Sequence, residues 1–415
     1  MLNISSGRRD FGIALAGRTV STFGDEVALV ALTLRLQADG GRPYEVALLL
    51  AAGTLPLLLL SRPIGRLVDS HDSRQLLAAA GLLEVACTVP LVFVHSVAIM
   101  VVLVAVLGAA AMTAGSTWSA LVPRIVGEDQ VAAAVSATQS LNALVAVGAP
   151  AVGGLLSGAF GTGLPLVVDA STFVVVTVAA VLIRTRRTPA AERSHAGQAA
   201  TPARGGFAIV RADPVLARLI AGLVVLVLLV GMVDVVLVYL VRVTLQAGGA
   251  WFGVAQAAWI AGIVAGSLGA GRLTSERART WATVAGAAVT CAALAAFALV
   301  PVVWLLAPLS VLGGTGNGYA NVCVSTLLVT RTPDGERGRV SAAVNAAVGG
   351  AQGISLLAGG AVAAVLSPRE IYGVAGLLGV AVAAALAIGV LRVPALAAPL
   401  DRGAVTVDHS GQAIP

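Results

Sequence analysis

The chain has 415 residues, of which 58% are hydrophobic and only 11% charged, and its mean hydropathy is +0.94. Soluble domains are about 45–50% apolar and about 25% charged, so this composition excludes the two or three globular domains that the length alone would suggest. The formal net charge is +6, and all 26 basic residues are arginine. The arginines lie in short loops between apolar runs, which favours membrane orientation over nucleic-acid binding.

Twelve apolar stretches are long enough to cross a lipid bilayer, which takes about 20 residues of helix. They cover residues 11–36, 44–61, 75–94, 97–118, 131–158, 164–183, 215–241, 251–271, 281–299, 302–329, 340–366 and 371–391. The stretches are apolar throughout and do not alternate as the strands of outer-membrane barrels do. The sequence therefore predicts an all-α membrane protein with twelve transmembrane helices.

The arginines predict the orientation of these helices. If the N-terminus is cytoplasmic, 21 of the 26 arginines lie in loops on that side, as the positive-inside rule requires. We therefore expect a plasma-membrane protein with no removable signal peptide, a cytoplasmic N-terminus over residues 1–10 and a cytoplasmic tail over 392–415. The longest polar stretch, 184–214, is predicted to be a cytoplasmic linker between six-helix bundles at 11–183 and 215–391.

Several charged or polar residues lie inside the predicted helices, where charge is costly and usually marks a substrate or proton path. Arg18 and Asp25 are seven residues apart, two turns along one face, and form either a functional site or a fixed structural pair. Asp169 is expected to be mostly structural. The full set of candidate proton or substrate residues is Arg18, Asp25, Glu26, Glu84, Asp169, Asp234 and Asn317.

Two further motifs lie in a loop and in a predicted helix. The loop at 62–74 contains Gly65, Asp69 and Arg74, a spacing typical of a tight turn with one capping carboxylate; the alternative is an ordinary arginine-rich turn. The stretch 131–158 contains Gly148, Pro150, Gly153 and Gly154. Its proline permits a bend and its glycines permit close helix approach, so generic helix packing is the alternative interpretation.

The two halves of the sequence resemble each other. Gly65-Arg66-Leu67 recurs as Gly271-Arg272-Leu273, and Gly153-Gly154 recurs as Gly359-Gly360, both at an offset of 206. Because both pairs fall at matching topological positions, they predict two pseudo-symmetric bundles arranged as parallel repeats.

The sequence contains no recognisable motif for a metal site, a cofactor or an enzyme active site. The three cysteines have no metal-ligand spacing, and without lysine there is no Walker loop for ATP. No catalytic triad is recognisable. We therefore predict no metal, no cofactor and no enzymatic activity.

These features resemble the major facilitator superfamily, whose members have two parallel six-helix halves joined by a cytoplasmic linker. The loop is similar to that family's signature at Gly65, Asp69 and Arg74, although Ser70 stands where an arginine is usual. The stretch from Gly148 to Gly154 is similar to the family's Gly-Pro-x-x-Gly-Gly antiporter motif, with Ala149 replacing a glycine. The Ser-x-x-Gly-Asp run ending at Asp25 resembles the drug-efflux branch that includes macrolide and siderophore exporters.

The resemblance implies a monomeric secondary transporter that works by alternating access, with the loop at 62–74 latching its cytoplasmic side. We expect proton-coupled efflux, by antiport, of a small and partly apolar compound. One alternative is a proton-coupled importer of a small nutrient, which needs more charged residues in its cavity. A remote alternative is a membrane-embedded enzyme or receptor, which needs a catalytic cluster or a large outer domain.

Overall fold

The computed structural model describes residues 4–127, 130–182 and 204–392, and in these ranges the chain forms helices and no strand. The helices are α1 (Ile4–Ala38), α2 (Pro43–Leu59), α3 (Ser61–Ser70), α4 (Ser73–Leu91), α5 (Val97–Val126), α6 (Val131–Phe160), α7 (Gly163–Leu182), α8 (Arg204–Ala212), α9 (Pro214–Tyr239), α10 (Gly249–Ala270), α11 (Glu276–Phe297), α12 (Leu306–Arg331), α13 (Arg337–Val362) and α14 (Pro368–Leu391). The prediction of an all-helical protein is confirmed. Most of the predicted linker and nearly all of the predicted tail lie outside the described residues.

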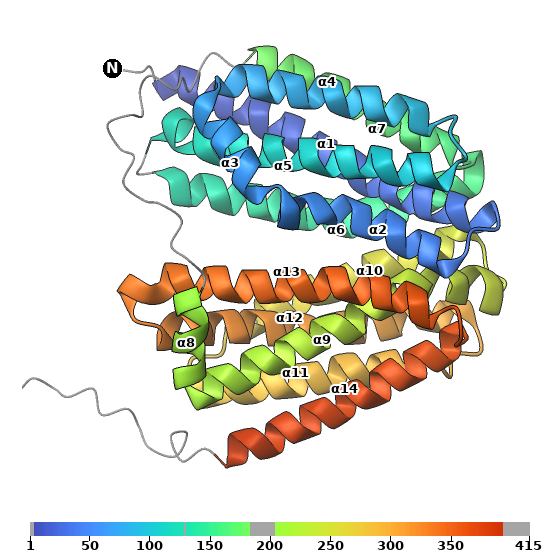
Figure 1. Cartoon of the computed structure of the whole chain (residues 1–415), viewed down its shortest axis with the longest axis vertical. Coiled ribbons are helices and arrows are strands. Elements are labelled where there is room, and N and C mark those ends of the chain that lie inside the picture. Colours follow the sequence, from blue (N-terminus) through green and yellow to red (C-terminus); the bar gives the residue numbers. More distant parts are fainter. Residues whose placement is uncertain (1–3, 128–129, 183–203, 393–415) are drawn as a thin grey trace, which may run out of the picture.

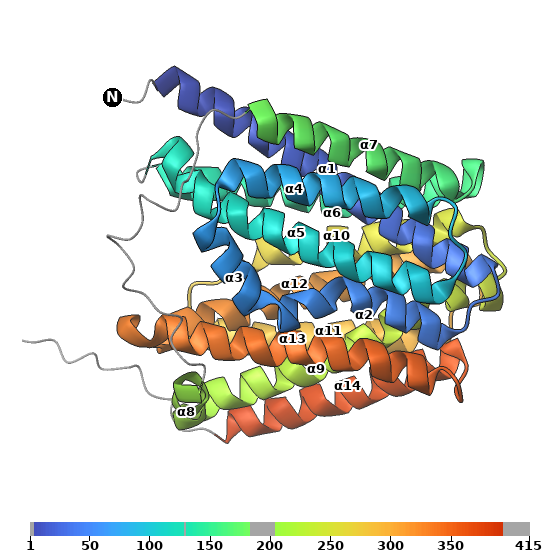
Figure 2. The ribbon, with the colours of Figure 1, turned by 45° about the horizontal axis from the view of Figure 1, so that its top comes forward.

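The long helices run roughly parallel to one another and form two groups (Figures 1 and 2). The first group contains α1 to α7 and the second α8 to α14. The start of α1 lies at the same end of the molecule as α3 and α8, and we call this the α3/α8 end. The turn between α1 and α2 lies at the opposite end.

Nine of the described helices are long and apolar enough to cross a membrane. Three other long helices fall short of this standard for local reasons. Helix α1 carries charged residues along its length, α2 has only 17 residues, and the middle of α12 is rich in glycine and asparagine. The apolar composition thus confirms a multi-pass membrane protein.

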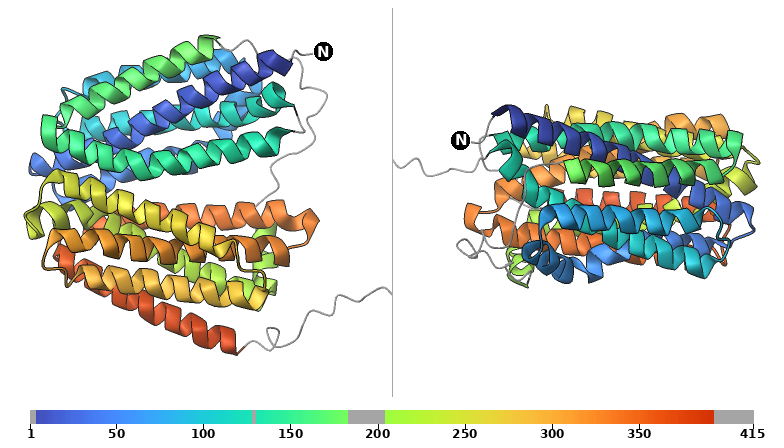
Figure 3. Two further views of the ribbon diagram at one scale, coloured as in Figure 1. Left: turned by 180° about the vertical axis from the view of Figure 1, so that it is seen from behind. Right: turned by 90° about the horizontal axis from the view of Figure 1, so that it is seen from above.

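Paired glycines let two helices approach at matching places in the two groups. Added Cβ atoms at Gly153 and Gly154 would lie about 3.0 Å from the backbones of α1 and α10, respectively. Gly359 and Gly360 approach the backbones of α9 and α2 in the same way. The rear view in Figure 3 shows α6 beside α10 where the two groups meet. Each pair thus packs one helix against its own group and against the other.

Two hydrogen bonds and a shared apolar core join the groups at the opposite end. The Tyr239 hydroxyl donates to the Gly41 carbonyl at 2.6 Å, and Arg242 Nε donates to Gln37 Oε1 at 3.3 Å. Buried side chains from α1, α2, α9 and α10 form one apolar cluster there. This end of the molecule is therefore closed.

Two segments expected to be irregular contain helices. Part of the predicted loop at 62–74 belongs to α3, whose Ile64 and Val68 are buried against Met112 and Ala120 of α5. Helix α8 lies within the predicted linker. Both helices are too short to span a membrane, so the long apolar runs from which the other helices were predicted do not include them.

Candidate functional site

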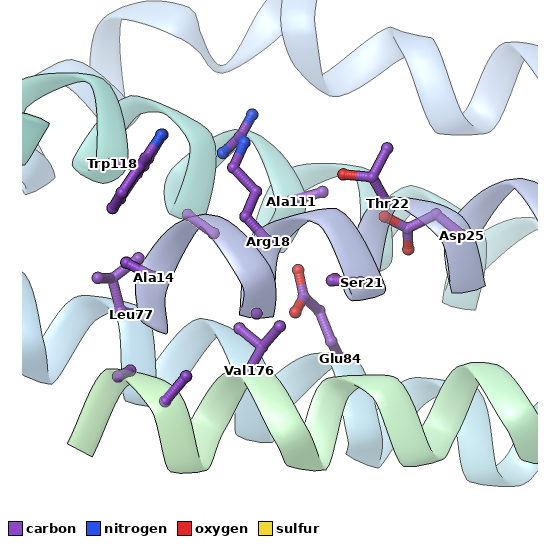
Figure 4. A pocket seen from close by; sticks show the side chains of 14 residues that line it. Ala14, Arg18, Ser21, Thr22, Asp25, Leu77, Glu84, Ala111, Trp118 and Val176 are labelled. Carbon is purple, nitrogen blue, oxygen red and sulfur yellow. The ribbon is translucent and has the colours of Figure 1, made fainter. Parts of the chain in front are cut away.

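A cavity of about 120 Å³ lies inside the first group of helices (Figure 4). It is lined by residues of α1, α4, α5 and α7, and three of these residues are the predicted candidates Arg18, Asp25 and Glu84. Its other walls are mostly small or apolar, including Ala14 and Val176. The fold thus brings together charged residues from two helices that are distant in sequence.

Glu84 is the most deeply buried acid in this cavity, with 3% of its surface exposed. Its carboxylate extends from α4 toward α1, near Arg18 and Ser21 (Figure 4). It lies within electrostatic range of Asp25 and Arg18. A buried carboxylate is costly unless it is neutralised or hydrogen-bonded, so this position is suited to binding a proton or a cationic group.

Arg18 lies in the same cavity as Asp25, and no ion pair between the two is formed in the described part of the chain. Among the described residues Arg18 makes no ion pair or hydrogen bond, and its buried Nε has no hydrogen-bond partner. Both Nη atoms lie 3.6 Å from the point where a Cβ of Gly115 would be. The absence of a side chain at Gly115 therefore leaves space for the guanidinium against α5.

Arg18 also lines a second cavity of about 290 Å³ between α1, α5 and α6. Trp118 is the other residue common to both cavities. The polar side chains of Thr138, Gln139 and Asn142 extend from α6 into this second space. Trp118 was not among the predicted site residues, because the sequence around a single aromatic residue at the end of an apolar run does not indicate which residues it contacts.

Asp169 lies beside this site in a packed position. It is 2% exposed, and a Cβ at Gly24 would lie 2.5 Å from its Oδ1. Thr172 next to it donates to the Asp169 carbonyl at 2.7 Å. Asp169 thus belongs to the close crossing of α1 and α7, while Glu26 is half-buried and does not line the cavity.

The candidates in the second group lie apart from this cavity. Asp234 borders a small cavity of about 30 Å³ together with Gln256 and Ser310. Asn317 Oδ1 accepts a hydrogen bond from Asn321 Nδ2 at 2.6 Å, and Asn321 faces an open space beside α12. Asn321 was missed, although its spacing of four residues from Asn317 places both on one face.

The predicted latch residues lie at the α3/α8 end. Gly65 and Asp69 are within α3 and Arg74 is in the first turn of α4. The carboxylate that caps α4 belongs to Asp72, whose Oδ1 accepts from the Arg74 backbone N–H at 2.9 Å. The expectation that Asp69 would be the capping residue is wrong, because the chain is helical through Ser70 and the new helix begins only after Asp72.

An ion-pair network at the same end of the second group was not predicted. Arg331 at the end of α12 donates to Asp213 Oδ2 at 2.8 Å and also bonds Glu276 of α11. Burial disfavours the charged form of Asp213, but hydrogen bonds from the Leu216 N–H and the Arg331 guanidinium outweigh it and hold the pKa of Asp213 below its ordinary value. These residues are scattered in sequence, and only packing of α9, α11 and α12 unites them.

Among the residues that the structure describes, no group of three or more His, Cys, Asp or Glu side chains could hold a metal ion. The glycines of the antiporter-like motif contact α1 and α10, as described above. Gly148 has open space around it, and Pro150 lies inside α6 next to Gly253 of α10. The contacts that the structure shows for this motif are those of close helix packing.

Three solved structures of similar fold are those of transporters or of transporter homologues. A bacterial homologue of the iron transporter ferroportin, in its inward-facing state, is 17% identical with a TM-score of 0.67, covering 92% of this chain and 98% of that one. The nucleoside transporter NupG is 12% identical with a TM-score of 0.71, covering 92% and 99%. A bacterial homologue of the lysosomal transporter Spinster, inward-facing and unoccupied, is 13% identical with a TM-score of 0.70, covering 93% and 96%.

Sequence comparison gives the family directly. A search of curated proteins found no match. The family model of the Major Facilitator Superfamily matches residues 14–351 and 236–407, well over half of the chain. The family and the structural relatives point to a transporter and not to an enzyme. This chain belongs to the major facilitator superfamily.

Proposed function

We propose that this protein is a proton-coupled secondary transporter that exports a small, partly apolar compound by alternating access. The twelve spans would be α1, α2, α4 to α7 and α9 to α14, arranged as two six-helix bundles. The protein would act as a monomer in the plasma membrane with both termini in the cytoplasm. The observation that carries the proposal is the cavity in which Asp25 and Glu84 lie together, with no ion-paired base among the described residues.

The chemistry of that cavity supports proton coupling. A carboxylate in a dry site needs a proton or a cation to neutralise it. Arg18 is near, but no ion pair joins it to Asp25 or Glu84 in the described part of the chain. Protonation and deprotonation of these carboxylates would therefore change the charge of the cavity and bias the conformational equilibrium.

The contacts between the two groups of helices support an inward-facing conformation. With the proposed orientation, the α3/α8 end is cytoplasmic and the closed opposite end is external. The cross-group hydrogen bonds of Tyr239 and Arg242 lie at that external end. Opening it would require these contacts to break, which is the transition expected of alternating access.

The direction of transport rests on the glycine and proline motif of α6 and on its resemblance to antiporters. The second candidate is a proton-coupled importer of a small nutrient. It is favoured by the polar wall of the second cavity, where Gln139 and Asn142 lie near Arg18. The two candidates differ in the relative direction of movement: a proton-coupled exporter moves substrate and proton in opposite directions, and a proton-coupled importer moves both in the same direction.

Transport by the purified protein in liposomes under an imposed pH gradient tests the proposal. Fluorescent, partly apolar compounds are screened for movement that reverses when the gradient is reversed. We expect Asp25→Asn or Glu84→Gln to abolish gradient-driven movement while the protein stays folded. Glu336→Gln is the matched control, because Glu336 lies outside the cavities described above. Full gradient-dependent transport by both cavity variants would refute the proton assignment.

A further inference from the structure

Arg18 holds a positive charge that the proton-coupling chemistry does not use. An arginine side chain stays charged in proteins and has five N–H donors in a planar fork. In the described chain Arg18 makes no hydrogen bond and no ion pair, and its Nε is buried. A partly buried guanidinium whose donors have no acceptor on the described protein chain is costly, so a ligand that accepts hydrogen bonds from it would be favoured.

The position of the guanidinium indicates where that ligand would bind. Glu84 approaches α1 from α4, whereas the Arg18 side chain extends toward α5 (Figure 4). Its Nη atoms lie near Gly115, and Arg18 lines the second cavity between α1, α5 and α6. The free donors are therefore accessible from a space of about 290 Å³ that is separate from the carboxylates.

The walls of this second cavity are of two kinds. Trp118 and the valines beside it provide apolar surface, while Thr138, Gln139 and Asn142 provide hydrogen-bonding groups. Among the residues that the structure describes, no acidic side chain lines this space. A ligand with a negatively charged head and an apolar or aromatic body would match both the cation and the walls.

We propose that Arg18 binds the anionic group of an amphipathic organic acid whose apolar body lies against Trp118 in the second cavity. This inference rests on the proposed function and names its substrate class. A carboxylate, sulfonate or phosphate can accept two parallel hydrogen bonds from one guanidinium. A neutral or cationic compound of the same shape would leave these donors unsatisfied.

Tryptophan fluorescence of the purified full-length protein tests the proposal without any proton gradient. The probes are benzoate, benzyl alcohol and benzylammonium, which share a ring and differ in charge. We expect a saturable response to benzoate alone in nanodiscs of phosphatidylcholine. Trp118→Phe should abolish the response, because the other four tryptophans do not line this cavity. Equal responses to the three probes, or no response to benzoate, would overturn the assignment.

Three variants separate the charge of Arg18 from its structural contribution. Arg18→Gln should weaken benzoate binding about ten-fold or more, the typical effect of losing a charged hydrogen bond, and Arg18→Lys should retain part of it. Gly115→Val keeps the charge but places methyl groups against the guanidinium, so it should also weaken binding. Unchanged affinity in both Arg18→Gln and Gly115→Val would refute the role of Arg18.

An anionic lipid headgroup is the other source of the same chemistry. The titration is therefore repeated in nanodiscs containing phosphatidylglycerol. An unchanged benzoate response assigns the site to a soluble acid, whereas suppression by the lipid would overturn that assignment. Because binding is measured without transport, failure of gradient-driven transport alone would leave the anion site standing and would refute only the proton-coupled function.

Discussion

The hydroxyl of Tyr239 forms a hydrogen bond that, in the proposed alternating-access cycle, would break when the closed end of the molecule opens. It donates to the Gly41 carbonyl at 2.6 Å, and the residue is 9% exposed. Tyr239→Phe removes this bond and keeps the ring in its packed position. An intramolecular hydrogen bond contributes about 0.5–1.5 kcal/mol net, so the population open at this end should rise about two- to ten-fold relative to the closed one.

Distances between spin labels across the closed end measure this shift. Labels at Ala38→Cys and Val243→Cys, in a chain whose three native cysteines are replaced by alanine, lie on exposed positions of different helix groups. The control is Tyr44→Phe, which removes a hydroxyl that bonds Glu45 within α2. We expect a larger long-distance fraction with Tyr239→Phe only. Identical distance distributions in all three proteins would refute the gating role of this bond.

Three other substitutions, one of them with a matched control, test separate parts of the structure. Gly154→Ala should lower the melting temperature, because its Cβ would lie 3.0 Å from Gly253 and overpacking costs about 1–3 kcal/mol, while Gly158→Ala, whose nearest neighbour is at 3.7 Å, should be tolerated. The pKa of Asp213 is lower in the folded protein than in the unfolded chain, so the ionised carboxylate stabilises the fold above its unfolded pKa of about 4, and this stabilisation is lost as the pH falls through the lower folded value. Asp213→Asn should therefore remove this loss from melting temperatures measured against pH. An unaltered fall of the melting temperature at acid pH would contradict this prediction. By resemblance to the family's latch, Asp69→Asn should shift the population toward inward-facing and slow transport; unchanged labelling of cavity cysteines from the two sides would reduce Asp69 to an ordinary helix residue.

The long helices could be predicted because apolar length is itself the physical requirement for crossing a bilayer. The residues at which these helices begin and end were predicted less accurately. The fifth long helix of the protein, α6, begins at Val131 as expected, but α5 extends beyond its predicted end at residue 118 to Val126. Gly127, with φ of +81°, ends α5. Hydropathy indicates which part of a helix is surrounded by lipid, whereas the helix itself ends where the backbone conformation changes.

The charged residues of the candidate site were recognisable, but their association was not. Arg18 and Asp25 share one helix, so periodicity places them on one face. Glu84 meets them because α7 packs against both α1 and α4. An added Cβ at Gly17 would lie 3.1 Å from Ala179, and Gly81 is in close contact with Thr177. These small residues set the helix spacing, and nothing in the local sequence of Glu84 identifies its neighbours.

The internal repeat predicts the packing of glycines better than the placement of charge. Paired glycines separated by 206 residues make equivalent close contacts, because backbone approach depends only on the absent side chain. The same offset places Ser70 at the position equivalent to Glu276, which bonds Arg331 in the second group. The Glu276 carboxylate of that network therefore has no counterpart at the corresponding position of the first group. The two groups share their helix packing, and each has its own set of charges at the α3/α8 end, which is where a two-state transporter can be biased toward one conformation.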